Sequence, residues 1–349
     1  MKIIDLRSDT VTHPTSSMYQ AMQQAELGDD VFGDDPTTIK LENLAAEITA
    51  KENGLLVPSG TMGNLIANLT HCSKGNEVLL GDRSHIFLYE VGGISALGGL
   101  FPHVLPTLQD GTMDLNHVEE SIRTENIHFP RTGLICLENT HNYCGGLPVS
   151  TDYTEQLCEL AHRGGLKVHL DGARIFNASI ALNVSVGELC KSVDSVMFCL
   201  SKGLSAPIGS VLCGSTQFIE AARKNRKMLG GGMRQTGLIA AAGIVALNEM
   251  RSRLIEDHQH AKMIADSLAE FNLVKINRES VQTNIIYFNL NAELIEPDKV
   301  IEAFYQRNIR FLYLGKSKYR MVTHQDISKE DVLKVVAAVK EIFSGLTEQ

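Results

Sequence analysis

The sequence predicts an α/β protein, in which a large domain with a mostly parallel sheet is followed by a smaller α+β domain. Short apolar strands alternate with helical segments between residues 55 and 212, as in parallel sheets that are covered by helices on both faces. After a long helical stretch at residues 238–268, this alternation stops. The 349 residues leave room for two domains of ordinary size.

We expect three parts along the chain. Residues 1–40 form an N-terminal arm rich in turn-forming residues, with one helix at 16–27. Residues 41–247 form the large domain and residues 248–349 the small domain. The large domain is expected to have a helix at 38–51, one that opens at the turn 59–63 and runs through residue 71, and a short one near 185–191. Its strands are expected at 55–57, 78–80, 103–105, 134–137, 167–170, 196–200 and 210–212. The small domain is expected to have strands at 281–290 and 319–322 and helices at 298–307 and 329–343.

Composition narrows the possible partners and compartments. The net charge of -9 argues against a nucleic-acid partner, which needs a basic face. The seven cysteines include no C-x-x-C pair, which favours a reducing, cytoplasmic compartment. The most apolar helical stretch, residues 238–247, is too short to span a bilayer, so we expect no membrane partner. The histidines lack metal-binding spacing, and no metal site is expected.

Two of the predicted strands end in a charged residue beside a glycine. One strand is followed by Asp171 and Gly172, and a later one by Lys202 and Gly203. Parallel strands bring their carboxyl ends to one edge of a sheet, where ligands bind. A lysine that forms a Schiff base and a carboxylate that pairs with the pyridine nitrogen are what pyridoxal 5'-phosphate (PLP) requires. The pair indicates a PLP site, although a solvated lysine and a structural aspartate would give the same pattern.

A glycine-containing turn supplies a candidate phosphate site. Residues 59–63 leave a predicted strand and open a helix, so the backbone N–H groups of Gly60, Thr61 and Met62 could hold a phosphate. Such turns are also common without a ligand. Together with Asp171 and Lys202, the turn would complete a cofactor site.

Two histidines and two arginines are further candidates. His85 follows a strand at the same sheet edge, where an imidazole could stack on a cofactor ring or carry a proton, and His128 lies in a loop. Arg174 and Arg320 could bind the carboxylate of an amino acid. Each could equally be a hydrogen-bonded loop residue or a surface ion pair. The glycine run at 230–232, before Arg234, could approach a ligand or a neighbouring subunit.

These residues together resemble the low-specificity L-threonine aldolase family of fold-type I PLP enzymes, whose large domain is like that of aspartate aminotransferase. The matching segments are DLRSDTVT (5–12), GDDVFGDDP (28–36), PSGTMGN (58–64), ENTHN (138–142), DGAR (171–174), LSKG (200–203) and GGMRQ (231–235), with a weaker match at RMVTH (320–324). Their order along the chain makes a chance agreement unlikely.

The resemblance implies a role for each candidate. Lys202 would form the Schiff base, Asp171 would pair with the pyridine nitrogen, and His85 would stack on the ring. The phosphate would be held around Gly60 and Thr61. The substrate carboxylate would be bound by Ser8, Arg174 and Arg320, and His128 would lie near the substrate hydroxyl. The resemblance also implies a homotetramer, a dimer of dimers with sites shared across interfaces. Phe32 departs from the tyrosine expected at its position.

The implied activity is retro-aldol cleavage of L-threonine, L-allo-threonine and related β-hydroxy-α-amino acids to glycine and an aldehyde. The sequence leaves the catalytic base open among His85, His128 and a held water. Another fold-type I activity, such as a β-eliminating lyase or an aminotransferase, would use Asp171 and Lys202 equally well. An inactive scaffold is a more distant alternative. The preferred β-substituent and the stereochemical preference at Cβ cannot be deduced.

Overall fold

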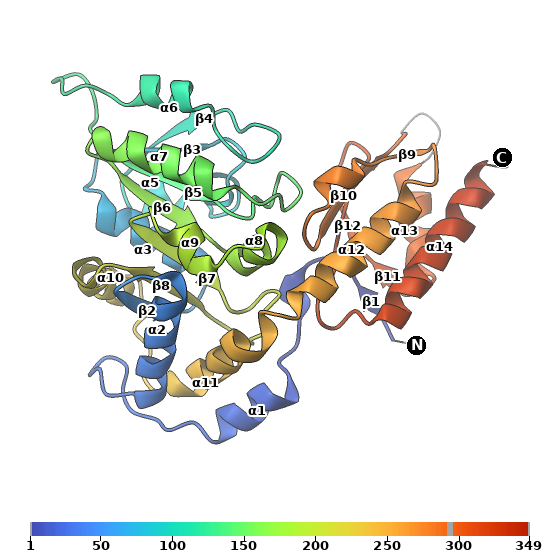
Figure 1. The fold of residues 1–349 in the computed structure, drawn as a ribbon, viewed down its shortest axis with the longest axis horizontal. Coiled ribbons are helices and arrows are strands. Elements are labelled where there is room, and N and C mark those ends of the chain that lie inside the picture. The colour runs from blue at the N-terminus through green and yellow to red at the C-terminus, as the bar shows by residue number, and fades with distance from the viewer. Residues whose placement is uncertain (1, 292–295, 348–349) are drawn as a thin grey trace.

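The protein folds into two lobes joined by a helix and by the N-terminal segment (Figure 1). This computed structural model describes residues 2–291 and 296–347. The large lobe is built on a seven-stranded sheet with the strand order β2-β8-β7-β6-β5-β3-β4. Its strands are β2 (Asn53–Val57), β3 (Glu77–Gly81), β4 (Phe101–Leu105), β5 (Thr132–Glu138), β6 (Lys167–Asp171), β7 (Ser195–Cys199) and β8 (Ser210–Gly214).

The sheet is mostly parallel, as the sequence predicts. The pairs β7-β6, β6-β5, β5-β3 and β3-β4 are parallel, and only β8 runs against its neighbours. Four of the five strands that run in parallel pairs are buried throughout or nearly so, which explains their continuous apolar sequences. The carboxyl ends of β5, β6 and β7 therefore lie next to each other.

Helices cover both faces of this sheet. The helices of the large lobe and its flanking segments are α1 (Ser16–Gln23), α2 (Pro36–Thr49), α3 (Gly60–His71), α4 (His85–Leu88), α5 (Gly93–Ala96), α6 (Leu115–Ser121), α7 (Thr151–Arg163), α8 (Ile175–Leu182), α9 (Val186–Cys190), α10 (Thr216–Met228) and α11 (Gly237–Val245). On one face, α2, α7, α8, α9 and α11 pack on side chains such as Val168 and Phe198. On the other face, α3 and α10 pack on Met197 and Leu212.

The small lobe is an antiparallel sheet with helices and has a core of its own. Its four-stranded sheet has the order β12-β13-β10-β9. The elements are α12 (Leu254–Leu268), β9 (Val274–Lys275), β10 (Ile285–Leu290), α13 (Pro297–Tyr305), β11 (Ile309–Arg310), β12 (Leu312–Tyr313), β13 (Lys318–Val322) and α14 (Lys329–Thr347), with a 3₁₀ turn η3 at Arg278–Ser280. Phe288, Phe304 and Phe343 are fully buried in this core.

The N-terminal arm contributes to both lobes. Strand β1 (Ile4–Asp5) pairs with β11, and Leu6 is buried in the small-lobe core. A 3₁₀ turn η1 (Asp9–Val11) follows, and Met18 of α1 is then buried in the large-lobe core. The arm thus connects the two lobes in addition to α12.

The structure differs from the predicted elements in three places. The helical stretch at 238–268 consists of α11, a π-helical turn η2 (Ala246–Met250) and α12. Leu254 packs in the large-lobe core and Ala261 in the small-lobe core. Helix α12 therefore belongs to both lobes, whereas the predicted domain boundary lies after residue 247. The strand expected from 281 begins at Ile285, and the buried side chains of Thr283 and Asn284, which precede it, bond Gly146 and Asp9 of the large lobe and the arm. The short strands β1, β9, β11 and β12 have too few residues for a recognisable pattern.

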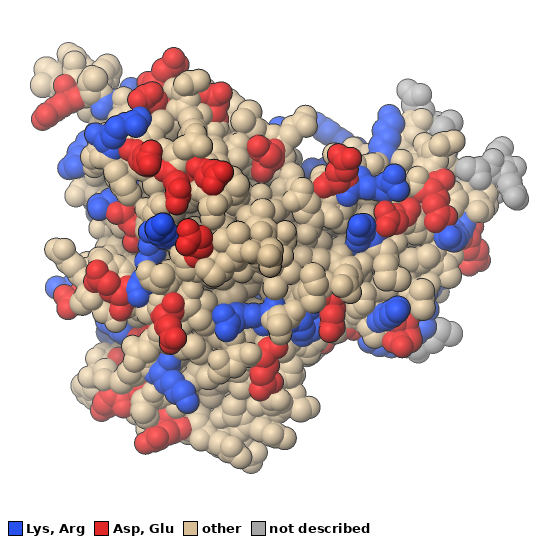
Figure 2. Space-filling view, in the orientation of Figure 1, with Lys and Arg blue, Asp and Glu red and all other residues tan. Residues whose placement is uncertain are grey.

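Charged side chains of both signs are spread over the surface. On the face shown in Figure 2, acidic and basic side chains are interspersed, without a large area of one sign. Among the described residues, no helix combines the length and apolar character needed to cross a membrane.

Candidate active site

A cavity of about 210 Å³ lies at the carboxyl ends of β6 and β7, on the edge that the sequence predicts. Asp171 is the last residue of β6, and Lys202 follows β7 by three residues. The cavity is lined by Ser59, Gly60, Thr61, Asn64, His85, Glu90, Asp171, Ala173, Met197, Cys199, Ser201 and Lys202. A larger hollow of about 700 Å³ beside the N-terminal arm contains neither Asp171 nor Lys202, so its size does not make it the reaction site.

Asp171 is buried and held in a fixed orientation. Its Oδ1 accepts a hydrogen bond from the Ala173 backbone N–H at 3.1 Å, and its Oδ2 accepts one from Asn64 Nδ2 at 2.9 Å. Only 2% of the residue is exposed. In the described part of the chain no cationic side chain is bonded to this buried carboxylate, which therefore suits a cationic group on a ligand, such as a protonated pyridine nitrogen.

His85 is oriented by two carboxylates. Its Nδ1 lies 2.9 Å from Glu90 Oε1, and its backbone N–H donates to Glu138 Oε2 at 2.7 Å. Burial opposes the charge of the ring, but the Glu90 hydrogen bond and the nearby Asp171 and Glu90 carboxylates outweigh it and raise the pKa of His85. Because Nδ1 is engaged, Nε2 is the ring nitrogen that can exchange a proton.

Glu90 and Asn64 are site residues that sequence reasoning did not single out. Burial raises the pKa of Glu90, although hydrogen bonds from His85 and Asn64 oppose the shift. Asn64 Nδ2 donates to Glu90 Oε1 at 2.8 Å as well as to Asp171. Asn64 does stand at the end of the PSGTMGN segment, one helical turn after Gly60, which is the signal that could have revealed it.

The first turn of α3 lies where the sequence predicts a phosphate site. Ser59 caps this helix by accepting the Met62 N–H on its Oγ. Gly60 and Thr61 line the cavity, whereas Met62 does not. A Cβ at Gly60 would lie 2.9 Å from Cys199 Sγ, so only glycine lets the helix start this close to β7. The helix N-terminus of Gly60 and Thr61 can therefore face an anion.

Arg174 is buried in a two-bond ion pair with Asp9. Its Nε and Nη2 donate to the Asp9 carboxylate at 2.7 and 2.6 Å. Burial alone would raise the pKa of Asp9, but the Arg174 charge and hydrogen bonds hold it well below its usual range. The pair leaves Arg174 Nη1 for another partner. Ser8 precedes Asp9 and caps the η1 turn by accepting the Thr10 N–H.

Arg320 reaches the same region from β13 of the small lobe. Its Nη1 donates to Asn142 Oδ1 at 3.3 Å and its Nη2 to the Arg7 carbonyl at 3.1 Å. Its Nε is buried and has no hydrogen-bond partner in the described part of the chain. Thr12 of the arm also bonds the Lys202 carbonyl at 3.0 Å. The candidate carboxylate-binding residues therefore come from the arm, α8 and the small lobe.

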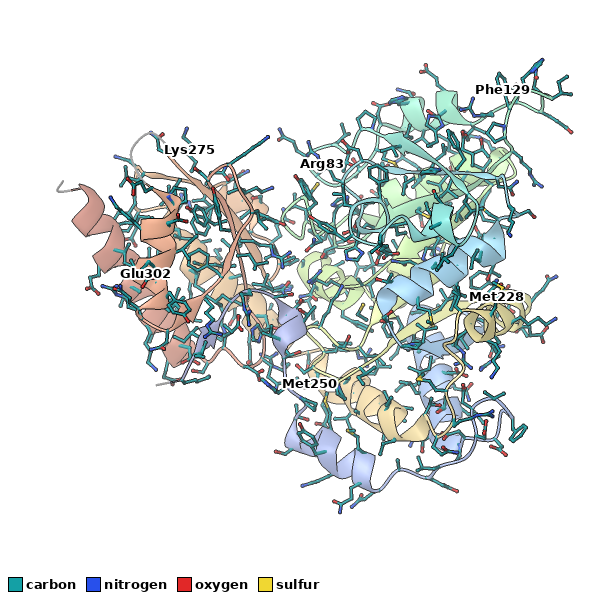
Figure 3. The ribbon with its side chains drawn as sticks, turned by 180° about the vertical axis from the view of Figure 1, so that it is seen from behind. Arg83, Phe129, Met228, Met250, Lys275 and Glu302 are labelled. Atoms are coloured by element: carbon teal, nitrogen blue, oxygen red, sulfur yellow. The ribbon has the colours of Figure 1, made fainter. Side chains whose placement is uncertain are left out.

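His128 is not brought to this cavity in its own chain. It is exposed in the loop before β5, at the amino ends of the parallel strands, whereas the cavity lies at their carboxyl ends. Figure 3 shows the neighbouring Phe129 at the outer corner of the large lobe, and Arg83, close to His85, where the two lobes meet. Phe32 is also exposed (79%), and Arg234 forms an exposed ion pair with Asp29.

Three groups in the cavity also have the spacing of metal ligands. His85, Glu90 and Asp171 place one ligand atom each within 4.8 Å of one another. Glu90 bonds both His85 and Asn64, and Asn64 bonds Asp171, so hydrogen bonds account for their proximity.

The residues at this edge fit PLP. A buried carboxylate, a lysine, a helix N-terminus that needs glycine and an imidazole surround one cavity, and these are the groups that the cofactor's pyridine nitrogen, aldehyde, phosphate and ring would contact. The fold and the site together define a fold-type I enzyme, the architecture of PLP-dependent catalysts.

Comparisons with known proteins identify the family. The chain matches the β-eliminating lyase family over residues 5–291. It is 48% identical over 352 residues to low-specificity L-threonine aldolase 1 of Arabidopsis thaliana, covering 100% of this chain and 98% of that protein. It is 42% identical over 335 residues to the low specificity L-threonine aldolase of Escherichia coli K12, covering 96% and 98%. The chain therefore belongs to the low-specificity L-threonine aldolase family and is a lyase.

The predicted fold class is confirmed by solved structures. A threonine aldolase from Leishmania major superposes with a TM-score of 0.84 at 17% identity, covering 97% of this chain and 99% of that one.

Proposed function

We propose that this protein is a PLP-dependent aldolase that cleaves L-threonine, L-allo-threonine and related β-hydroxy-α-amino acids to glycine and an aldehyde. The observation that carries the proposal is the placement of Asp171 and Lys202 at the carboxyl ends of adjacent parallel strands, around one cavity. The names of relatives that are 42–48% identical support the substrate class.

The cofactor, when bound, would supply an electron sink that stabilises negative charge at Cα. Lys202 would hold it through Nζ, and Asp171 would keep the pyridine nitrogen protonated. Gly60 and Thr61 would bind the phosphate. His85 would stack on the ring.

The substrate would be oriented by its carboxylate. Arg174 Nη1, Arg320 and Ser8 would bind this group, which sets the direction of the Cα–Cβ bond. A base removes the proton of the β-hydroxyl, the Cα–Cβ bond breaks and the hydroxyl oxygen becomes the aldehyde oxygen. A proton added at Cα then gives glycine. His85 Nε2 is the base candidate inside this chain's cavity, and a water held there is the alternative.

We also propose that the protein is cytoplasmic and forms a homotetramer, a dimer of dimers. An exposed apolar surface beside the site supports this assembly. Phe87, Leu88, Tyr89 and Val91, which flank Glu90, are all exposed, Val91 to 95%. Another copy could cover this apolar surface. In such an assembly, His128 and Phe32 would lie at the site of a second copy. Within its own chain, His128 does not reach the cavity.

The test is an absorbance spectrum of the purified protein with PLP, before and after addition of L-threonine, with glycine and acetaldehyde assayed in the same tube. A visible band from the bound cofactor together with both products supports the aldolase. The band with a 2-keto acid instead would favour a β-eliminating lyase or an aminotransferase. A protein that takes up no PLP would contradict the proposal and favour the inactive scaffold.

A further inference from the structure

A buried row of polar side chains runs from the cavity through the core to the far end of α3. Asn64 bonds Asp171 and Glu90 on the cavity side, and its Oδ1 lies 3.0 Å from His169 Nε2. His169 Nδ1 lies 2.8 Å from Ser195 Oγ, and His71 Nε2 lies 2.8 Å from the same oxygen. Asn64, His169 and Ser195 are completely buried. No water can compensate a broken link there, so each link needs a matched donor and acceptor.

The direction of donation in this row follows from Asn64. One atom of its amide faces two carboxylate oxygens, which accept but cannot donate when ionised, so this atom must be the NH₂ nitrogen. Its Oδ1 is then an acceptor for His169, whose Nε2 must carry the proton.

The remaining links follow in turn. Burial lowers the pKa of His169 to about 4 and that of His71 to about 3, so both rings are neutral near pH 7. In a neutral ring only one nitrogen carries a proton. His169 Nδ1 therefore accepts from the Ser195 hydroxyl, and Ser195 Oγ accepts from His71 Nε2–H. Each hydrogen bond of the row is therefore donated in the direction of Asp171 and Glu90.

We propose that Asn64 is a positioning residue of this site, and that the row His71, Ser195, His169 and Asn64 keeps Asp171 and Glu90 as oriented hydrogen-bond acceptors. This inference rests on the proposed PLP chemistry. Asp171 can pair with a protonated pyridine nitrogen only while it is ionised, and Glu90 orients His85 through Nδ1. The Asn64 amide thus links Asp171, which would pair with the pyridine nitrogen, to Glu90. Through Glu90 it also orients His85, which would contact the ring and carry a proton.

The test compares two asparagines on α3. Asn64→Leu removes the donor shared by the two carboxylates. Asn68→Leu is the matched control, since Asn68 is equally buried one turn later, and its side chain bonds the Asn64 carbonyl and Cys136 and not the two carboxylates of the cavity. We expect Asn64→Leu to raise the PLP dissociation constant about 10- to 100-fold and Asn68→Leu to leave it within about twofold. Circular dichroism checks that both variants are folded.

The pH dependence separates positioning from packing. The ionisable groups around Asp171 are His85, Glu90, Cys136, His169 and Lys202. Without the Asn64 donor, which opposes the effect of burial on the pKa of Glu90, the Glu90 carboxyl should retain a proton to higher pH and orient His85 less well. The ratio of variant to wild-type dissociation constants should therefore increase from pH 8 to pH 6. A ratio that does not change with pH, or equal effects of the two variants, would overturn the proposal.

A second measurement is made on the wild-type chain and needs no bound cofactor, and a variant serves only to assign one signal. In the full chain labelled with ¹⁵N-histidine, long-range ¹H–¹⁵N correlation spectra give the tautomer of each ring. The His169 signal is assigned by its loss in His169→Gln. We expect the Nε2–H tautomer, and an Nδ1–H tautomer would refute the direction of donation. A wild-type protein that binds no PLP would instead refute the proposed function and leave this result standing.

Discussion

The two halves of the candidate site are built differently. The cofactor half consists of Asp171, Asn64, Glu90 and His85, all from the large lobe, and its buried polar atoms bond one another. The carboxylate half consists of Ser8, Arg174 and Arg320, which come from the arm, α8 and β13 of the other lobe. There, Arg320 Nε is buried without a partner in the described residues.

This difference indicates two roles. The cofactor half is formed within one lobe and needs no ligand to be in place, which suits a group that stays bound. The carboxylate half depends on how the lobes and the arm meet. It retains unused hydrogen-bond donors, which suits a substrate that binds and is released in each turnover. Substitutions in the first half should change cofactor binding, whereas those in the second should change substrate binding.

The largest effect is expected at Lys202, where the cofactor half would hold PLP. Lys202→Ala should lower kcat at least about 10⁴-fold, because the covalent attachment and a proton carrier are both lost. Dialysis should then remove the cofactor, which absorbance of the retained protein measures. Full turnover with an unchanged visible band would show that the site has been assigned to the wrong lysine.

The Asp9–Arg174 pair should carry the largest stability effect of the carboxylate half. Asp9→Asn leaves a buried guanidinium without its counter-charge and should cost about 3–5 kcal/mol in unfolding free energy. Asp5→Asn is the control, since Asp5 pairs with Arg7 at the surface and should cost about 1 kcal/mol or less. Urea unfolding measures both. Equal costs would mean that the buried pair is not what fixes Arg174.

Arg320→Leu tests whether the halves act separately. We expect KM for L-threonine to rise about 100-fold, from the loss of a charged hydrogen-bonding partner, while the PLP dissociation constant stays the same. Arg310→Leu is the control, because Arg310 stacks on Tyr305. Steady-state kinetics measure KM for L-threonine, and PLP titration measures the dissociation constant of the cofactor. A matching loss of cofactor affinity would join the two halves into one unit.

The same division explains what the sequence could predict. Asp171 ends a strand, and Lys202, His85 and Gly60 come soon after strand ends, so the alternating strand pattern was enough to bring them to one edge. Asn64, Glu90 and Asp9 could not be found this way. Asn64 faces the cavity because of the helix's rotation about its axis, and the partner of Asp9 lies 165 residues away. His128 was placed by resemblance, and its own chain does not bring it to the cavity.

The buried His169, which lies beside Asn64 of the cofactor half, predicts a pH dependence of stability. His169 has a folded-state pKa of about 4, below its unfolded value of about 6.5. The unfolded chain therefore binds more protons in this range, and the contribution of a neutral His169 is complete above pH 6.5 and is lost as pH falls towards 4. His85, Glu90 and Asp257 have raised pKa values and act in the opposite direction, so a difference measurement is needed.

His169→Gln provides this difference, because an amide keeps a donor but does not titrate. The stability difference between wild type and variant should shrink from pH 7 to pH 5, by at most about 1.4 kcal/mol per pH unit. Chemical denaturation of the cofactor-free proteins at the two pH values measures it. A constant difference would mean that His169 is not held neutral by burial.

The smallest effect is expected at His128, a predicted site residue that lies in neither half. Because its side chain is exposed, His128→Ala should leave unfolding free energy and PLP affinity unchanged. If a second copy brings it near the substrate hydroxyl, kcat/KM should still fall about tenfold, less than for a sole catalytic base, since His85 or a water remains. His117→Ala, an exposed histidine on α6 of the same lobe, is the control. Equal activity of both variants would confine the site to the two halves of a single chain.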